Sequence, residues 1–137
     1  MRKYLLHVLI ISFIFLLAPT AQVATYAGVH EFLEEEVRKN PDDAEAHYLL
    51  GGAYYESGKY KEAIESYKQA IRLDPDNAWG HFGLGFVYGK SGKYKEAIKS
   101  FKQGIRIDPD DRDAHYYLGI AEKAMKDKSR SWWQFVV

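Results

Sequence analysis

The chain contains the segment SGKYKEAI at residues 57–64 and repeats it unchanged at residues 91–98. The identity extends outward into two blocks, residues 44–77 and 78–111, which agree at 21 of 34 positions without a gap. A third copy begins at Arg112 and fades after its first eight residues. Self-similarity with this period indicates a solenoid of stacked helix pairs rather than one closed domain.

Residues at fixed positions of the blocks resemble the tetratricopeptide repeat (TPR) pattern. The first block carries the pattern at His47, Leu50, Gly51, Tyr54, Ala63, Tyr67 and Pro75, and the second at His81, Leu84, Gly85, Tyr88, Ala97, Phe101 and Pro109. The third copy keeps only its start, at His115, Leu118 and Gly119. The family usually has Trp at the first of these positions, whereas this chain has His in every copy. The resemblance covers roughly residues 44–122 and implies an all-α fold, a short TPR solenoid of antiparallel helix pairs.

Capping signals mark the expected helix ends inside each repeat. In the first repeat a helix is predicted over residues 44–57, with Asp42 or Asp43 as its N-cap. Gly58 suits the left-handed residue that ends this helix, and a second helix is predicted over residues 60–73. The Asp-Pro-Asp-Asn turn that follows caps the next helix. The same helix-ending glycine and Asp-Pro turn recur one repeat later.

The N-terminal segment has the layout of a secretory signal peptide. A basic start is followed by a nearly continuous apolar run over residues 5–18 and by Thr-Tyr-Ala at residues 25–27, which suits cleavage. We therefore expect residues 1–27 to be a signal peptide and the protein to be exported, either periplasmic or secreted. The apolar run is shorter than the roughly 20 residues of a membrane span. An uncleaved anchor formed by residues 5–18 remains the alternative, in which the protein is held at the membrane.

Composition excludes several classes of function. The formal net charge is zero, and it becomes −2 when residues 1–27 with Arg2 and Lys3 are removed, so no basic footprint for nucleic acid is expected. The chain has no cysteine, which excludes disulfides and thiol catalysis.

Both ends of the solenoid are predicted to be atypical. Residues 28–41 form an N-terminal capping helix, and residues 112–137 form a partial third repeat or C-terminal cap. Within it, residues 129–137 are predicted to be a shortened second helix that packs back on the helix over residues 112–126. The competing possibility is a loose tail that folds into the aromatic groove. The apolar residues expected to favour dimerisation or a partner at this end are Trp132, Trp133 and Val137.

One face of the first helix of each repeat carries an unexpected aromatic strip. Repeat positions 2, 5, 9 and 12 lie roughly 120° from the core stripe, where a solvated face should be polar. In TPR proteins this face lines the concave groove that holds a partner peptide, and the resemblance carries that role to these positions. The predicted groove residues are Tyr48, Tyr55, Trp79, Phe82, Phe86, Tyr116 and Ile120. The alternative is that a segment of the protein itself covers the strip.

Nothing in the sequence indicates catalysis, a metal or a cofactor. His47, His81 and His115 share one repeat position, but equivalent residues on successive helices are separated by roughly 8–10 Å. Zinc requires each nitrogen about 2.0–2.1 Å from one ion, so a packing role is favoured. No glycine-rich phosphate loop and no defensible acid/base pair is present.

These observations favour a non-catalytic protein–protein interaction module, a TPR adaptor or scaffold that binds a peptide segment of a partner in the aromatic groove. The alternative is a self-associating structural unit of an envelope assembly. The expected partner is a protein or peptide, with a possible homodimer, and contact with a membrane is expected only through an uncleaved N-terminal segment.

Overall fold

The computed structural model describes residues 28–136, with residues 130–136 placed only as part of a helix. All regular structure in this part of the chain is helical: residues 28–39, α2 (Ala44–Glu56), α3 (Tyr60–Leu73), α4 (Ala78–Lys90), α5 (Tyr94–Ile107) and α6 (Arg112–Val136). The predicted signal peptide, residues 1–27, lies outside the described residues. None of the described helices is long and apolar enough to cross a membrane.

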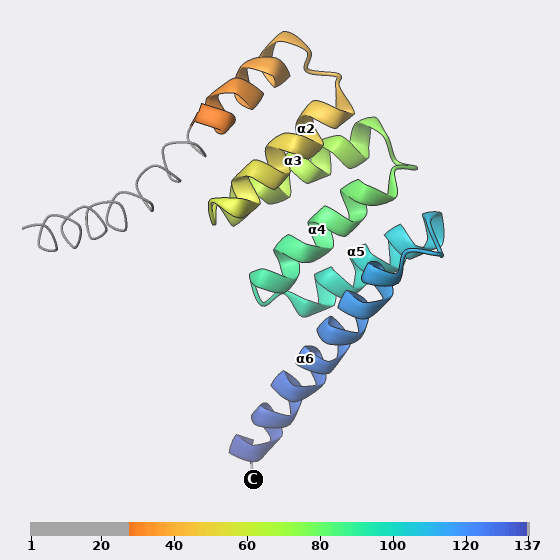
Figure 1. Ribbon diagram of the computed structural model, residues 1–137. Helices are drawn as coiled ribbons and strands as arrows, with labels where there is room; N and C mark the ends of the chain where they lie inside the picture. The colour runs from red at the N-terminus through yellow and green to blue at the C-terminus, as the bar shows by residue number, and fades with distance from the viewer. Residues whose placement is uncertain (1–27, 137) are drawn as a thin grey trace, which may run out of the picture.

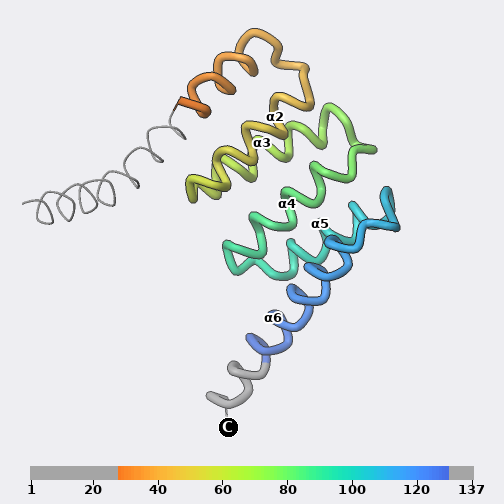
Figure 2. The backbone as a smooth tube through the Cα atoms, viewed as in Figure 1, coloured from red at the N-terminus to blue at the C-terminus, as the bar shows by residue number. Residues whose placement is uncertain are grey.

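The helices form antiparallel hairpins that stack side by side (Figures 1 and 2). The α2–α3 hairpin packs against the α4–α5 hairpin mainly through α3 and α4, and α6 packs against α5. This is the architecture that a solenoid of helix pairs requires, because each hairpin buries its apolar face only against its neighbours.

The helix ends predicted inside the first full repeat are confirmed to within one residue. Asp43 is the N-cap of α2, and its Oδ1 accepts hydrogen bonds from the backbone N–H of Glu45 and Ala46 at 2.9 and 3.2 Å. The glycines that end α2 and α4 are left-handed, with φ of 74° at Gly58 and 72° at Gly92. Such a φ strains any residue with a side chain, so glycine ends both helices at the same repeat position.

Aromatic rings packed onto glycines hold the hairpins together. The buried Tyr67 ring of α3 lies between Gly51 of α2 and Gly83 of α4, where an added Cβ would approach ring carbons to 2.9 and 2.5 Å. One repeat later, a Cβ at Gly85 would meet Phe101 of α5 at 2.9 Å. Small residues thus let the helices approach closely. Burial of the ring also raises the pKa of the Tyr67 hydroxyl well above its usual range.

The repeated histidine ties each helix to the turn before it. The Nε2–H donates to the backbone carbonyl of the proline six residues earlier, because a carbonyl can only accept. The distances are 2.9 Å for His47 to Pro41, 3.2 Å for His81 to Pro75, and 2.9 Å for His115 to Pro109. The histidine therefore fixes the turn through a hydrogen bond at the position where the family usually has Trp.

The helical segment of residues 28–39 covers the N-terminal end of the solenoid. The buried His30 donates from Nε2 to the Ala53 carbonyl of α2 at 2.8 Å. Nearby, the Tyr54 hydroxyl donates to Glu34 Oε1 at 2.6 Å. Burial and this carboxylate raise the pKa of Tyr54 to about 12, so the hydroxyl remains a donor at neutral pH.

The C-terminal end differs from the prediction. Helix α6 runs without a break from Arg112 to Val136, so the predicted shortened second helix over residues 129–137 is wrong. Lys126 occupies the repeat position of Gly58 and Gly92, and without a left-handed glycine the helix continues instead of turning back. The side chains of the predicted self-association residues Trp132, Trp133 and Val137 lie outside the described part of the chain.

Candidate functional site

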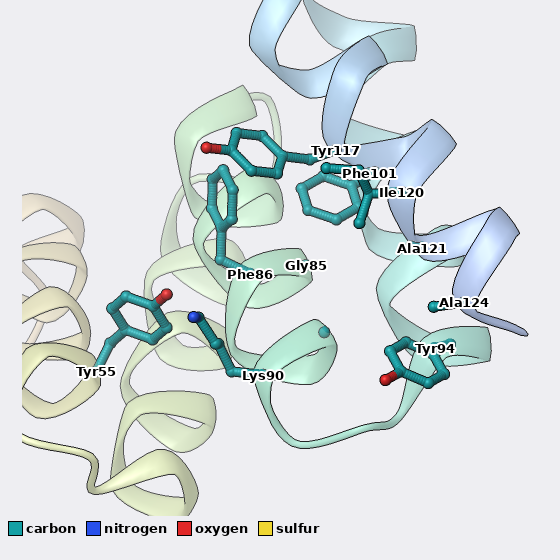
Figure 3. A pocket seen from close by; sticks show the side chains of 11 residues that line it. Tyr55, Gly85, Phe86, Lys90, Tyr94, Phe101, Tyr117, Ile120, Ala121 and Ala124 are labelled. Atoms are coloured by element: carbon teal, nitrogen blue, oxygen red, sulfur yellow. The ribbon is translucent and has the colours of Figure 1, made fainter. Parts of the chain in front are cut away.

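A cavity opens between α4, α5 and α6, with one wall residue from α2. Its volume is about 580 Å³, and Figure 3 shows the side chains that surround it. The side chains that matter chemically come from four helices: Tyr55 of α2, Phe86 and Lys90 of α4, Tyr94 of α5, and Tyr117 and Ile120 of α6. This space is large enough for a side chain of a bound peptide.

Three aromatic rings form the wall between α4 and α6. The Phe86 ring meets the Tyr117 ring edge to face, with centroids 4.5 Å apart and planes at 78°. It also meets Phe101 edge to face at 5.3 Å. Edge-to-face contacts are the preferred arrangement of such rings. The wall is therefore held in place before any partner arrives.

Two glycines on α4 keep the cavity open. A Cβ at Gly89 would have no atom within 4 Å, because this residue faces the empty space. Gly85, one turn earlier, lets the Phe101 ring of α5 lie directly on the α4 backbone. A larger residue at Gly89 would occupy the cavity itself.

Hydroxyl and ammonium groups give the otherwise apolar cavity its polarity. Among the described residues that line the cavity, Lys90 has the charged side chain and none carries a carboxylate. Figure 3 shows the Tyr55 hydroxyl and the Lys90 nitrogen pointing toward the same space at the α2 side. Burial raises the pKa of Tyr55, and the nearby charge of Glu56 raises it by a smaller amount. The hydroxyl therefore stays neutral and can donate a hydrogen bond.

The predicted groove residues separate into three groups. The structure brings Tyr55, Phe86 and Ile120 together in the cavity. Tyr48, Trp79 and Tyr116 lie on the same helices but outside the cavity. Tyr48 packs against Tyr67, Trp79 is 56% exposed, and Tyr116 packs on Tyr117. A role for these three in binding stays a prediction.

The assignment of Phe82 to the groove is wrong. Its side chain is only 3% exposed and belongs to the core between α4 and α5. The ring fills a notch at Gly104 of α5, where a Cβ would overlap it. The first repeat has Ala70 at the position of Gly104. Because glycine has no side chain, Gly104 leaves room for the Phe82 ring, which its position on the helix face alone would have left exposed.

Tyr117, Lys90 and Tyr94 were missed by the sequence argument. Tyr117 precedes Ile120 by three residues, and Lys90 follows Phe86 by four, so both lie one turn from a predicted groove residue on the same helix face. Extending the strip by one turn in each direction would have found them. Tyr94 belongs to α5, and only the packing of the hairpins brings it to the cavity.

A family model described as TPR repeat matches residues 51–92 and 90–125, which is more than half of the chain. No curated protein matches the chain. A crystal structure of MamA protein superimposes with a TM-score of 0.72 at 26% sequence identity, and the match covers 83% of this chain and 63% of that one. The chain thus spans less than two thirds of that MamA structure.

Two further solved structures share the arrangement of helices. The TPR domain of Sgt2 from Aspergillus fumigatus matches with a TM-score of 0.74 at 18% identity, covering 82% of this chain and 76% of that one. The first TPR of Spaghetti (RPAP3), bound to the HSP90 peptide SRMEEVD, matches with a TM-score of 0.73 at 16% identity, covering 77% and 83%. At these identities the two structures show the fold alone.

Proposed function

Because the chain belongs to the tetratricopeptide repeat family, we propose that it is a protein-interaction module that holds a segment of a partner protein in the cavity between α4 and α6. The observation that carries this proposal is the preformed wall of Phe86, Phe101 and Tyr117 beside an open volume of about 580 Å³. A related fold in RPAP3 was solved with an HSP90 peptide, which supports peptide binding as a use of this architecture.

The chemistry of the cavity defines the partner segment. An aromatic, largely apolar space of this size favours a bulky aliphatic or aromatic side chain. Lys90 and the hydroxyls of Tyr55 and Tyr94 lie at its border and favour an acceptor next to that side chain, such as a carboxylate. We therefore propose a peptide in which a large apolar residue is adjacent to an acidic one.

Ile120→Asp is expected to weaken this binding strongly. Ile120 is 46% exposed, so the change introduces a charge at the cavity without opening the core. Peptides would first be selected on the wild-type protein from a random peptide library. Their affinity for the variant, measured by fluorescence anisotropy, is expected to fall by about thirtyfold or more, corresponding to the roughly 2 kcal/mol of an anchor contact.

Met125→Asp is the matched control for this experiment. Met125 is 40% exposed on the same helix and does not line the cavity, so peptide affinity should be unchanged. Equal losses in the two variants, or a selected peptide that tolerates Ile120→Asp, would place the binding site elsewhere.

We further propose that residues 1–27 direct export and that the mature protein begins at or near Gly28. The basic start, the apolar run and the Thr-Tyr-Ala segment motivate this proposal. N-terminal sequencing of protein recovered from cell fractions tests it, and recovery of Met1 from the soluble cytoplasmic fraction would contradict it. Met1 on membrane-bound protein would instead support the anchor formed by residues 5–18.

A further inference from the structure

Each end of the solenoid is one half of a repeat. In the repeat frame, α6 begins at the position where α2 and α4 begin, so it is the first helix of a repeat. The helical segment over residues 28–39, here called the N-terminal helix, ends at the position where α3 and α5 end. It is therefore the second helix of a repeat. The two half-repeats lie at opposite ends of the stack (Figure 1).

The N-terminal helix packs on α2 in the way that α3 packs on α4. Its His30 donates to the carbonyl of Ala53, and the residues at the same positions one repeat later, Ile64 and Val87, lie in one core cluster. The other face of α3 and of α5 is covered by the first helix of the same repeat. This equivalence identifies the face of the N-terminal helix that α2 leaves uncovered.

That face carries exposed apolar side chains. Val29 is 41% exposed, although Ala63 at the same repeat position is 0% exposed. Phe32 is 64% exposed, although Ser66 at the same repeat position is buried. No helix of the described residues covers these side chains. The N-terminal helix is thus a second helix that presents its apolar face where a first helix belongs.

Helix α6 has the complementary opening. Gly119 shares the repeat position of Gly85, where an added Cβ would lie 2.9 Å from the Phe101 ring. An added Cβ at Gly119 would have no atom within 4 Å, so among the described residues this notch is empty. On the same face Tyr116 is 66% exposed, although Phe82 at its repeat position is buried. Because α6 continues without a break, the chain does not fold back to fill the notch.

We propose that copies of this chain join head to tail, and that the N-terminal helix of one copy completes the third repeat of the next. In the joined pair α6 supplies the first helix of that repeat and the N-terminal helix of the other copy supplies the second. The two faces are different, so the contact is heterologous and produces open chains of molecules rather than closed dimers. The cavity wall of Phe86, Phe101 and Tyr117 lies outside this contact, so the proposal does not depend on peptide binding.

The internal hairpins place Leu33 of the adjoining copy at the empty notch. Leu33 has the repeat position of Tyr67 and Phe101, whose rings fill the notches of the two full repeats. A leucine is smaller than either ring, so the two helices can approach as closely as those of an internal hairpin. One turn away, Val29 would lie on the aliphatic stem of Lys123.

The same register brings Tyr116 to Glu36 of the adjoining copy. In the α4–α5 hairpin the residues at these positions are Phe82 and Gly104, which lie against each other. The Tyr116 hydroxyl can donate a hydrogen bond to the Glu36 carboxylate. Glu36 also pairs with Lys39 of its own helix at 3.4 Å, and such an exposed pair contributes little that a new contact would have to replace.

The charges of the two faces are complementary. The N-terminal helix contains four glutamates against Arg38 and Lys39. On a helical wheel of α6, the charged residues within about 45° of Gly119 are all basic. They are Arg112, Lys123 and Lys126. The carboxylates of α6 lie further round the helix, and Glu122 among them already pairs with Lys102 of α5.

Cross-linking of the full chain tests the contact directly. The protein has no cysteine, so introduced thiols report only the chosen positions. Tyr116→Cys and Glu36→Cys proteins are mixed and treated with a short bismaleimide, and intact-mass spectrometry identifies the products. A covalent dimer with one copy of each variant is expected, in large excess over either homodimer.

Trp79→Cys replaces Tyr116→Cys in the matched control. Trp79 is also an exposed aromatic residue near the start of a first helix, but its helix α4 already has its partner α5. Mixing it with Glu36→Cys should give no dimer above the background of the single variants.

Gly119→Arg tests the notch itself. The fold should be kept, because the new Cβ meets no atom and arginine favours a helix more than glycine does. Introduced into the Tyr116→Cys protein, it should lower the yield of mixed dimer by about tenfold or more, since its side chain takes the space of Leu33. Met125→Arg changes an exposed residue on another face of the same helix and should leave the yield unchanged.

Mixing two blocked variants tests the direction of assembly. Phe32→Arg blocks the N-terminal end, and Gly119→Arg blocks the C-terminal end. In sedimentation velocity each variant alone should remain monomeric at concentrations where the unchanged chain forms species larger than a dimer. An equimolar mixture should form a dimer and nothing larger, because one functional end of each kind remains.

Three results would overturn the proposal. A dominant homodimer of Tyr116→Cys would show that two α6 helices meet symmetrically. Failure of the mixed dimer to form at any concentration would show that another segment, such as residues 1–27, covers one of the faces. An undiminished yield with Gly119→Arg would show that the notch is not part of the contact.

Discussion

Phe82→Ala is expected to lower the free energy of unfolding by about 3–5 kcal/mol, the usual cost of truncating a buried phenylalanine. The ring is 3% exposed and lies in the Gly104 notch between α4 and α5. Its removal leaves a cavity that the two helix backbones cannot close. Urea denaturation followed by circular dichroism measures the change.

A second substitution separates packing from other causes. Gly104→Leu alone should also destabilise the protein, because its Cβ would overlap the Phe82 ring. In the Phe82→Ala background the leucine fills the space that the ring left, so the double variant should be more stable than Phe82→Ala. A double-mutant cycle with strictly additive losses would show that the two residues do not share one site.

Gly83→Ala is expected to destabilise the junction between the two hairpins. The added Cβ would lie 2.5 Å from Cε1 of the Tyr67 ring, which Gly51 blocks from the other side. Overpacking of this kind costs about 1–3 kcal/mol. The loss should be visible as a lower midpoint of thermal unfolding, and Tyr67→Leu in the same chain should relieve part of it.

Gly89→Ala is the matched control, six residues later on the same helix. Its Cβ would have no atom within 4 Å, so only the gain in helix propensity remains. Stability should rise by up to about 1 kcal/mol. If both glycine variants shift stability in the same direction, the tight fit of Tyr67 between the hairpins is not what makes Gly83 necessary.

The ends of α2 to α5 could be predicted from the sequence because the signals for them are local. Asp43 caps α2 with its own side chain, and Gly58 and Gly92 end helices by adopting a backbone conformation that other residues avoid. The repeat of these signals every 34 residues also predicted the stacking of hairpins, since a helix pair cannot bury its apolar face alone.

The sequence by itself therefore determined helices α2 to α5 and their order, and it predicted as groove residues three that line the cavity, Tyr55, Phe86 and Ile120. Only the tertiary structure decided which aromatic residues of one helix face are buried. Phe82 and Phe86 are one turn apart on the same face of α4, yet Gly104 of α5 accepts one ring while the other stays at the open cavity. Burial of a side chain depends on the shape of the facing helix, which helical periodicity does not contain.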